Sequence, residues 1–324
     1  LAPILISALA NAIVGLYIFF GGSGADHLVI GGRFFRAFGT FGQPNPFGGF
    51  MGITIPIALM GAYGFLLKLW QRYKSNQNIS LIDGLMLGVF VAIAAILFAA
   101  LIASWSRGAW LGFIISLGVM AFAIPRRLSV SASVSLGLAV LLLLLWFGGL
   151  IPQSIVARLT TAATDFITIE EIRGVDITSI NYAVVERIAH WQAAINMSEA
   201  NPIFGIGLGN YEIVYDQYRL LNWKEPLGHA HNYYLNILAE TGIIGVLTYI
   251  TFWGSVFAIS WNTRQHPDLF TRSIVIGLLG SWTYIAVHSL FDNLYVNNLF
   301  LHIGLLLSIL SILHLQIGKT ITLE

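Results

Sequence analysis

Cysteine is absent from the 324-residue chain, and charged residues make up only 10% of it. Without cysteine the chain has no disulfide framework, no thiol nucleophile and no thiolate metal site. Soluble domains average roughly 25% charged residues, so the low charge argues against a water-soluble globule. Lysine and arginine number 16 against 15 aspartate and glutamate, which gives a net charge of +1. No basic excess is available to hold nucleic acid by counterion release, so that class of function is excluded.

The hydrophobic residues, 57% of the chain, are concentrated in eight long runs. A helix that crosses a hydrocarbon core about 30 Å thick needs about 20 apolar residues, because each residue advances it by about 1.5 Å. In lipid every backbone amide must be bonded within its own helix or a closed barrel, so each run predicts a helix. The predicted spans are residues 1–20, 47–70, 81–103, 108–124, 129–150, 233–261, 272–290 and 294–317. The expected fold class is all-α, a polytopic helical membrane protein with about eight transmembrane helices.

We divide the chain into three parts of one integrated membrane domain. Five spans occupy residues 1–150, a loop subdomain occupies 151–232, and three spans occupy 233–324. The chain begins with Leu1, and no basic segment or small-residue cleavage site precedes the first apolar run. This start does not have the pattern of a signal peptide, so we expect further helices upstream.

Lysine and arginine collect in alternate connections between the predicted spans. Alternate connections lie on the same side of the membrane. Because lysine and arginine are retained on the cytoplasmic side, we assign the side with the basic connections to the cytoplasm. Its basic residues are Lys68, Arg72, Lys74, Arg126, Arg127, Arg264, Arg272 and Lys319. The outward side then holds residues 21–46, 104–107 and 151–232 and the turn at Asp292.

The outward loop 151–232 is far longer than most connections between helices. Loops of that length are generally functional or form small subdomains. Within it, Val184, Ile188, Trp191 and Ile195 recur at i, i+4, i+7 and i+11, which predicts an amphipathic helix over residues 181–200. We expect the chemistry of the protein in this loop.

Arg107 lies in the sequence SWSRGAW at an outward edge of the membrane, where the distribution of basic residues makes an arginine less expected. One interpretation is a snorkelling side chain that anchors the span beside Trp105 and Trp110. The other is an anion ligand, because guanidinium presents a planar donor fork that fits phosphate oxygens. We favour the anion ligand.

Arg33 and Arg36 belong to the first outward loop, ahead of two X-Pro steps at Pro44 and Pro46. A residue before proline is pushed toward extended geometry, so these steps predict a rigid extended path. The two arginines could complete a cationic bowl for a diphosphate, or they could neutralise acidic residues of the outward loops. We group them with the candidate substrate-binding residues.

Arg187 lies on the predicted loop helix, with His190 three residues and Trp191 four residues later. Residues at these spacings lie on neighbouring parts of one helix face, so Arg187 could stack on Trp191. Pairing with Glu186 is the structural alternative. We place Arg187 among the candidate catalytic residues and Trp191 among the substrate-binding ones.

His229 and His231 occur in GHAHNYY, where the long loop enters the sixth span. A helix start presents free amides and a partial positive charge, which favours a neutral imidazole and also attracts an anion. A neutral imidazole can accept a proton, so His231 is the candidate base, with His229 and Asn232 beside the substrate. Glu240 lies about 13.5 Å along the helix from His231. An acid at that depth needs a partner, either to hold helices together or to take part in the reaction site.

Other kinds of site find little support in the sequence. A metal site at the His-x-His pair needs a third ligand, and only Glu240 and Asp292 are candidates, without a zinc-like spacing, so we predict none. The glycines at 205, 207 and 209 follow no strand and precede no Gly-Lys-Ser or Gly-Lys-Thr, which excludes a phosphate-binding loop. The sequence contains no Gly-x-Ser-x-Gly elbow, so nothing in it indicates a serine hydrolase.

Several of these segments together resemble one family. His231 and Asn232 are followed, after nine residues, by Gly-Ile-Ile-Gly at 242–245. This arrangement resembles the His-Asn-x9-Gly-x-x-Gly pattern of the O-antigen ligase family, which includes polysaccharide polymerases and bacterial protein O-oligosaccharyltransferases. Other similar elements, in the family's usual order, are QPNPF around Asn45, SRGAWLG around Arg107, Arg187 with Trp191, and NPIFGIGLGNY at 201–211.

The resemblance implies a glycan donor linked to undecaprenyl diphosphate and an acceptor on the outer face of a bacterial cytoplasmic membrane. It implies an inverting transfer in which His231 takes the acceptor's hydroxyl proton while Arg107 and Arg187 bind the diphosphate. No cofactor or metal is then expected. The acceptor stays open between a lipid, a second lipid-linked repeat unit and a protein. A transporter is the alternative from another class, but it predicts polar residues near mid-membrane, whereas here they gather at the outward edge.

Overall fold

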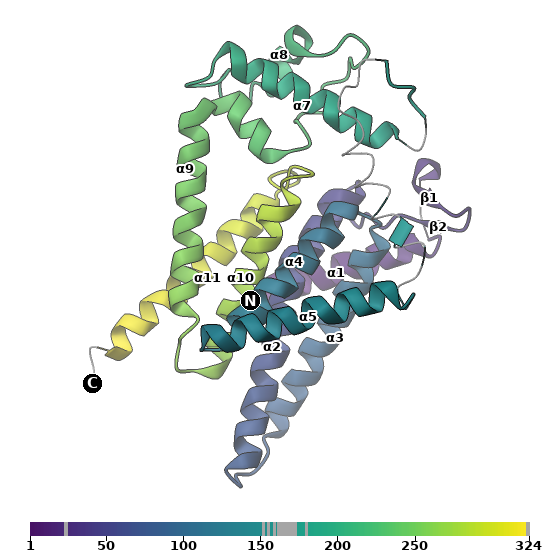
Figure 1. The fold of residues 1–324 in the computed structure, drawn as a ribbon. Helices are drawn as coiled ribbons and strands as arrows, with labels where there is room; N and C mark the ends of the chain where they lie inside the picture. The colour runs from purple at the N-terminus through teal and green to yellow at the C-terminus, as the bar shows by residue number, and fades with distance from the viewer. Residues whose placement is uncertain are drawn as a thin grey trace. The chain divides into compact units, whose positions relative to one another are not determined.

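Helices form nearly all of the regular structure (Figure 1). A computed structural model describes residues 1–22, 25–150, 153, 156–157, 160, 174–178 and 181–321. The helices are α1 (Ala2–Phe19), α2 (Pro44–Lys74), α3 (Leu81–Ala103), α4 (Arg107–Ala123), α5 (Leu128–Phe147), α7 (Tyr182–Ala200), α8 (Tyr211–Tyr218), α9 (Tyr233–Thr263), α10 (Leu269–His288) and α11 (Leu299–Ile321). The short strands β1 (Val29–Ile30) and β2 (Phe34–Phe35) pair antiparallel after a 3-10 turn, η1 (Asp26–Leu28). The predicted all-α polytopic membrane fold is confirmed.

Within the residues that the structure describes, fewer helices qualify as membrane spans than the about eight predicted, although each of the eight predicted segments contains a helix. In the described part of the chain, six helices are long and apolar enough to cross a membrane: α1, α2, α3, α9, α10 and α11. The helix α4 has 17 residues and is thus about 25 Å long, which is short of a core about 30 Å thick. In α5 the apolar helix among the described residues is Leu128–Gly137. Two of the about eight predicted spans therefore do not qualify by length and composition among the described residues.

The path through Pro44 and Pro46 is helical, so the predicted extended path is wrong. Pro44 is the first residue of α2, and Pro46 lies in its first turn. Proline is tolerated there because the first amides of a helix have no partner within it. The steric rule for the residue before proline therefore applies at Gln43, which is extended and marks the start of α2. It does not prevent Pro44 and Pro46 from lying in the first turn of that helix.

The chain forms two units, and the first comprises residues 1–138, 255–288 and 294–324. Within it, α2 and α10 pack closely along their lengths. The hydroxyl of Tyr284 donates to the carbonyl of Gly48 at 2.8 Å, and that of Ser281 donates to the carbonyl of Ile53 at 2.7 Å. A methyl group at Gly52 would collide with the Tyr284 ring. Small residues and buried hydroxyl bonds thus hold the two helices together, as is usual between transmembrane helices.

The second unit comprises residues 139–254 and 289–293. Its core is formed by the buried residues Ala193, Ala194, Met197, Tyr211, Tyr215, Ala230 and Ala239. The amphipathic helix expected over 181–200 is α7, but the predicted apolar stripe is rotated from the buried face. Of that stripe only Val184 is buried, while the alanines take the centre of the interface. Small side chains on α7 leave room for the two tyrosine rings of α8.

The helix α9 is broken at Gly242, whose φ of 62° and ψ of −164° are not helical. The backbone of the preceding loop fills the break. The amide of Ile206 donates to the carbonyl of Ala239, and the amide of Ile243 donates to the carbonyl of Pro202, both at 2.9 Å. The segment after α7 is therefore docked onto α9 by main-chain hydrogen bonds.

Candidate active site

His231 lies at the end of the long loop, two residues before α9 begins. The side-chain oxygen of Asn232 accepts hydrogen bonds from the amides of Tyr234 and Leu235, at 3.0 and 3.1 Å. Asn232 therefore caps the helix, because it satisfies first-turn amides that have no partner within the helix. The cap fixes the chain direction at His231, whose backbone is left-handed with a φ of 51°.

Asp292 approaches the ring of His231 from the connection that follows α10. Its Oδ1 atom lies 3.4 Å from Nδ1 of His231 and 4.0 Å from Nε2 of His229. The two segments are joined by a main-chain hydrogen bond of 2.8 Å from the amide of Tyr233 to the carbonyl of Ser289. The carboxylate is only 5% exposed. Residues far apart in the sequence thus form one His-His-Asp cluster, in which Asp292 is buried and the two histidines are half-buried.

The carboxyl group of Asp292 is ionised in this cluster. Burial by itself would raise its pKa, but the neighbouring ring of His231, and then His229 and Arg187, outweigh burial and hold the pKa well below its usual range. An ionised carboxylate beside an imidazole can orient the ring and stabilise its protonated form.

His229 is neutral at physiological pH. Burial lowers its pKa to about 4; Asp292 opposes that shift, and His231 and Arg187 add to it. Nδ1 of His229 accepts a hydrogen bond of 3.1 Å from the amide of His231, so the ring proton is assigned to Nε2, which faces Asp292. His229 therefore presents a neutral donor to the carboxylate.

Both ring nitrogens of His231 are buried, and neither has a hydrogen-bond partner among the described residues. Leaving a buried polar atom unpaired costs roughly 1–3 kcal/mol, and in native structures such atoms call for an explanation. The hydroxyl of Tyr215 is also unpaired among the described residues, but of the two groups the imidazole is the one that can accept a proton near neutral pH. This is the state expected of a group whose partner is a substrate.

His190 is a residue of the site that sequence analysis considered only as a neighbour of Arg187 on the helix. Its ring stacks on Tyr215 at 4.9 Å and meets the ring of His231 edge-on at 5.7 Å. Nδ1 lies 3.1 Å from the hydroxyl of Tyr211. Burial, followed by the charges of His231 and His229, lowers the pKa of His190 to about 4, so a neutral imidazole borders the ring of His231.

Arg187 is held beside the cluster by two main-chain carbonyls. Its Nε donates to Phe291 at 3.3 Å and its Nη1 to Ala183 at 2.7 Å. Phe291 immediately precedes Asp292, so the guanidinium is fixed next to the carboxylate. Trp191 lies one helical turn further along α7 and is half-buried. The structure thus brings together Arg187, His229, His231 and Asn232.

Glu240 has a partner that accounts for its burial. Its Oε1 accepts a hydrogen bond of 3.2 Å from the amide of Tyr211, the first residue of α8. A carboxylate at a helix N-terminus is stabilised by free amides and by the helix dipole. Of the two roles considered for Glu240, this contact supports the structural one, because it ties α8 to α9.

The other predicted cations belong to the first unit. Arg107 is the first residue of α4 and is half-buried. Arg36 donates from Nε to the carbonyl of Ser104 at 3.1 Å and from Nη2 to Oδ1 of Asn45 at 3.2 Å. Arg33 is exposed and lies over the ring of its neighbour Phe34 at 5.1 Å.

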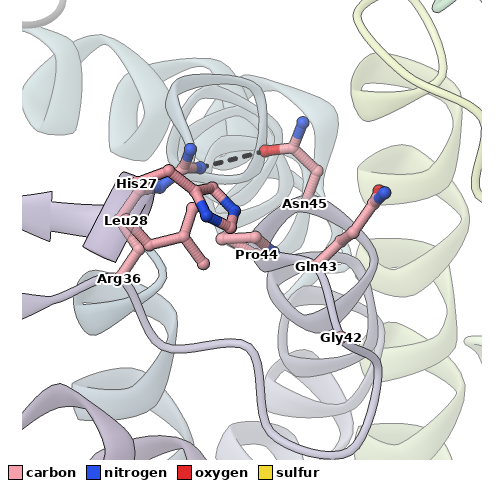
Figure 2. A pocket seen from close by; sticks show the side chains of 7 residues that line it. All are labelled: His27, Leu28, Arg36, Gly42, Gln43, Pro44 and Asn45. Atoms are coloured by element: carbon pink, nitrogen blue, oxygen red, sulfur yellow. Dashed lines mark hydrogen bonds between the residues drawn. The ribbon is translucent and has the colours of Figure 1, made fainter. Parts of the chain in front are cut away.

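Arg36 lines a small polar cavity of about 210 Å³ at the start of α2. Figure 2 shows the hydrogen bond between Arg36 and Asn45, with the ring of His27 and the amide of Gln43 nearby. The bonds of Arg36 join the first loop to α2 and to the end of α3. This guanidinium therefore orders the loop, whatever else it binds.

The same histidines offer a ligand set that sequence spacing did not reveal. One ligand atom each from His229, His231 and Asp292 lies within 4.8 Å of the others. Two imidazoles and one carboxylate are ligand types that catalytic zinc sites use, with water in the fourth position. Asp292 is one of the two third ligands considered from the sequence, and the structure places it, and not Glu240, beside the two histidines.

The chain is similar to one family of known proteins. A family model described as O-antigen ligase matches residues 92–250, from within α3 to within α9. The matched region contains Arg107, Arg187, His229 and His231, whereas Asp292 lies beyond it. No curated protein matches the chain significantly.

Proposed function

Because the chain belongs to the O-antigen ligase family, we propose that it transfers a glycan from an undecaprenyl-diphosphate-linked donor to an acceptor hydroxyl. The reaction takes place on the outer face of a bacterial cytoplasmic membrane. The family supports ligase-like or polymerase-like activity in general, in a multi-pass membrane protein. The observation that carries the finer proposal is the buried, unpaired ring of His231, held 3.4 Å from an ionised Asp292.

The proposed chemistry is an inverting displacement at the anomeric carbon. His231 accepts the proton of the acceptor hydroxyl while the hydroxyl oxygen forms the new bond to the anomeric carbon. The bond from the anomeric carbon to the diphosphate oxygen breaks, and the lipid diphosphate leaves with its electron pair. General-base assistance of this kind typically contributes about 10²- to 10⁴-fold in rate.

Asp292 is the orienting carboxylate in this proposal. With the Nδ1 proton of His231 directed at Asp292, the Nε2 lone pair is available to the acceptor. Catalytic hydrogen bonds are often long before substrate binds, so a 3.4 Å separation suits this role. The negative charge also stabilises the imidazolium that forms, as in hydrolases that combine histidine with aspartate.

Arg187 supplies positive charge for the departing diphosphate. Its position is set by the carbonyls of Phe291 and Ala183, so its guanidinium does not have to be ordered during the reaction. Fixed donors aimed at developing charge are the most effective form of electrostatic catalysis. Contact of Arg107, Arg33, Arg36, Trp191 or His229 with substrate stays a prediction from sequence.

Replacement of Arg187 by alanine should lower the rate of glycan transfer by about 10²-fold, because one fixed donor to the leaving group is lost. The transfer rate of Arg187→Lys should lie between those of the unmodified protein and Arg187→Ala, since lysine keeps the charge but not the planar fork. The assay uses the protein in vesicles with a labelled undecaprenyl-diphosphate glycan. Arg72→Ala is the matched control, because that arginine pairs with Asp83 at 3.3 Å and belongs to the first unit.

The outcomes of this assay separate the alternatives. Unchanged transfer in Arg187→Ala would remove Arg187 from the site. Longer chains formed from donor alone would identify a polymerase, and labelled protein would identify a protein glycosyltransferase. Donor carried across the vesicle membrane without any new glycosidic bond would replace the enzyme by a transporter.

A chelator distinguishes the proposed mechanism from a metal-assisted one. We expect transfer to continue at the same rate after treatment with EDTA, because Arg187 provides the positive charge near the leaving group. The measurement compares initial rates before and after dialysis against the chelator. Loss of activity that a single divalent cation restores would assign His229, His231 and Asp292 to a metal centre instead.

A further inference from the structure

The segment between α7 and α8 carries large apolar side chains that the protein does not cover. Ile203 is 54% exposed, Phe204 is 74% exposed and Leu208 is 80% exposed. These residues lie on one short loop in which Gly205 and Gly207 have positive φ. Large exposed apolar side chains that gather on one loop are candidates for an interaction site.

The loop is attached to α9 where that helix is broken. Besides the two hydrogen bonds described above, the amide of Gly207 donates to the carbonyl of Glu240 at 2.9 Å. Carbonyls of α9 that lose their helical partners at Gly242 thus receive loop amides, and an amide beyond the break finds a loop carbonyl. Non-helical backbone is tolerated at membrane depth only where its polar groups are bonded within the protein, and this loop meets that condition.

The break also lies where the apolar part of α9 begins. Residues 242–261 form a run of 20 residues, and such a run is about 30 Å long, the thickness of a hydrocarbon core. Glu240 and Asn236 precede this run, whereas Ile243, Ile244 and Leu247 inside it are 46%, 44% and 57% exposed. The loop is therefore bonded to α9 at the boundary between its polar start and its lipid-facing surface.

We propose that residues 201–208 form an interfacial membrane anchor whose apolar tip lies among the acyl chains of the bilayer. The occupant of this surface is phospholipid hydrocarbon of the leaflet at the Tyr233 end of α9. The surface continues the exposed face of α9, a helix that is itself long and apolar enough to cross the membrane. A protein partner would have to displace lipid from that face, whereas lipid covers both surfaces without a break.

A groove beside the loop agrees with this assignment. It has a volume of about 370 Å³ and is lined by Leu208 and by α9 residues from Tyr233 to Phe252. Ile237, Tyr249 and Phe252 make its walls largely apolar. Water in such a groove would be unfavourable, whereas an acyl chain fills it. The loop and the groove therefore present one surface to the same hydrocarbon.

Single-cysteine labelling tests the anchor directly, because the chain has no cysteine of its own. Phe204→Cys and Leu208→Cys carry an environment-sensitive nitrobenzoxadiazole probe in vesicles of phosphatidylethanolamine and phosphatidylglycerol. Gln217→Cys is the control, since Gln217 is an exposed polar residue of α8 in the same unit. We expect the probes at 204 and 208 to show blue-shifted emission, quenching by nitroxide-labelled acyl chains and loss of quenching by aqueous iodide. The probe at 217 should show the reverse.

Iodide quenching of the probes at 204 and 208 equal to that at 217 would overturn the anchor. A blue shift that nitroxide lipids do not quench would mean that a protein surface covers the loop, and would also overturn it. Each labelled variant is first compared with the unmodified protein in thermal unfolding. Where labelling unfolds the protein, the unlabelled variant Phe204→Asp is used instead of the labelled one. We expect Phe204→Asp to lower the thermal stability of the protein in vesicles, whereas Gln217→Asp should leave it unchanged.

Discussion

Replacement of His231 by alanine is expected to lower the rate of glycan transfer by about 10²- to 10⁴-fold. The variant loses the group proposed to accept the acceptor's proton. Asp292, Arg187 and the helix start keep their places, because the cap is made by Asn232 and not by His231. Binding of the lipid-linked donor should therefore change little. The measurement is the single-turnover rate in vesicles at saturating donor, together with donor affinity.

Two further variants connect this loss to proton transfer. Asp292→Asn should lower the rate by a comparable amount, about 10²- to 10⁴-fold, because a neutral amide neither fixes the ring nor stabilises imidazolium. Free imidazole added to His231→Ala should restore part of the rate, since it fills the space that the side chain vacates. His314→Ala is the control, because His314 lies on α11 in the first unit, where its Nδ1 is 2.9 Å from the hydroxyl of Thr263.

Full activity in His231→Ala would end the proposed mechanism. A loss accompanied by an equally weakened donor affinity would instead make His231 a binding group. The two results differ because an interaction made only in the transition state lowers the rate without changing ground-state binding. Measuring affinity in the same vesicles is thus what decides between the roles.

The local sequence was sufficient to place His231 and Asn232 at the start of a helix, while the proposed role of His231 stays a prediction. The His-Asn pair before an apolar run indicates a capped helix start, and the structure has that cap at Asn232. Arg187 was found because it lies on a helix whose period is visible in the sequence. These predictions rest on interactions between residues near one another in the chain, which spacing alone encodes.

Asp292 was considered from sequence only as a possible metal ligand. Its place beside His231 depends on how the connection after α10 meets the start of α9, through the amide of Tyr233 and the carbonyl of Ser289. No periodicity or motif reports a contact of that range. The available signal was topological, since the predicted orientation placed the turn at Asp292 on the same side as the long loop.

The buried face of α7 shows a different limit of sequence patterns. The largest apolar residues of that helix, including Ile188 and Trp191, predicted the stripe, yet Ala189 and Ala193 occupy the interface. Tyr211 and Tyr215 bring the volume from the other side, and their rings pack against small residues. Which side chains of a helix are buried therefore depends on the face it packs against as well as on its own. The sequence of α7 alone does not contain the shape of the α8 face.

Replacement of Gly242 by alanine is expected to destabilise the protein by about 2–5 kcal/mol, from backbone strain and overpacking together. With φ at 62° and ψ at −164°, the residue occupies a region that is essentially restricted to glycine. A methyl group there would lie 2.7 Å from the nitrogen of Phe204 and closer still to the carbonyl of Ile203. Both are backbone atoms, so no side chain can rotate away to relieve the contact.

Gly254→Ala is the matched control for this prediction. Gly254 lies on the same helix, and a methyl group there would meet nothing within 4 Å. Alanine in a helix interior is favoured over glycine by about 0.5–1 kcal/mol, so this variant should be unchanged or slightly more stable. Thermal unfolding in detergent should show a lower midpoint for Gly242→Ala alone. Equal midpoints for the two variants would mean that the docked loop contributes nothing to stability. A fall confined to residue 242 would instead trace the stability to the loop that fills the helix break, and thus to the same contact that sets the depth of the proposed anchor.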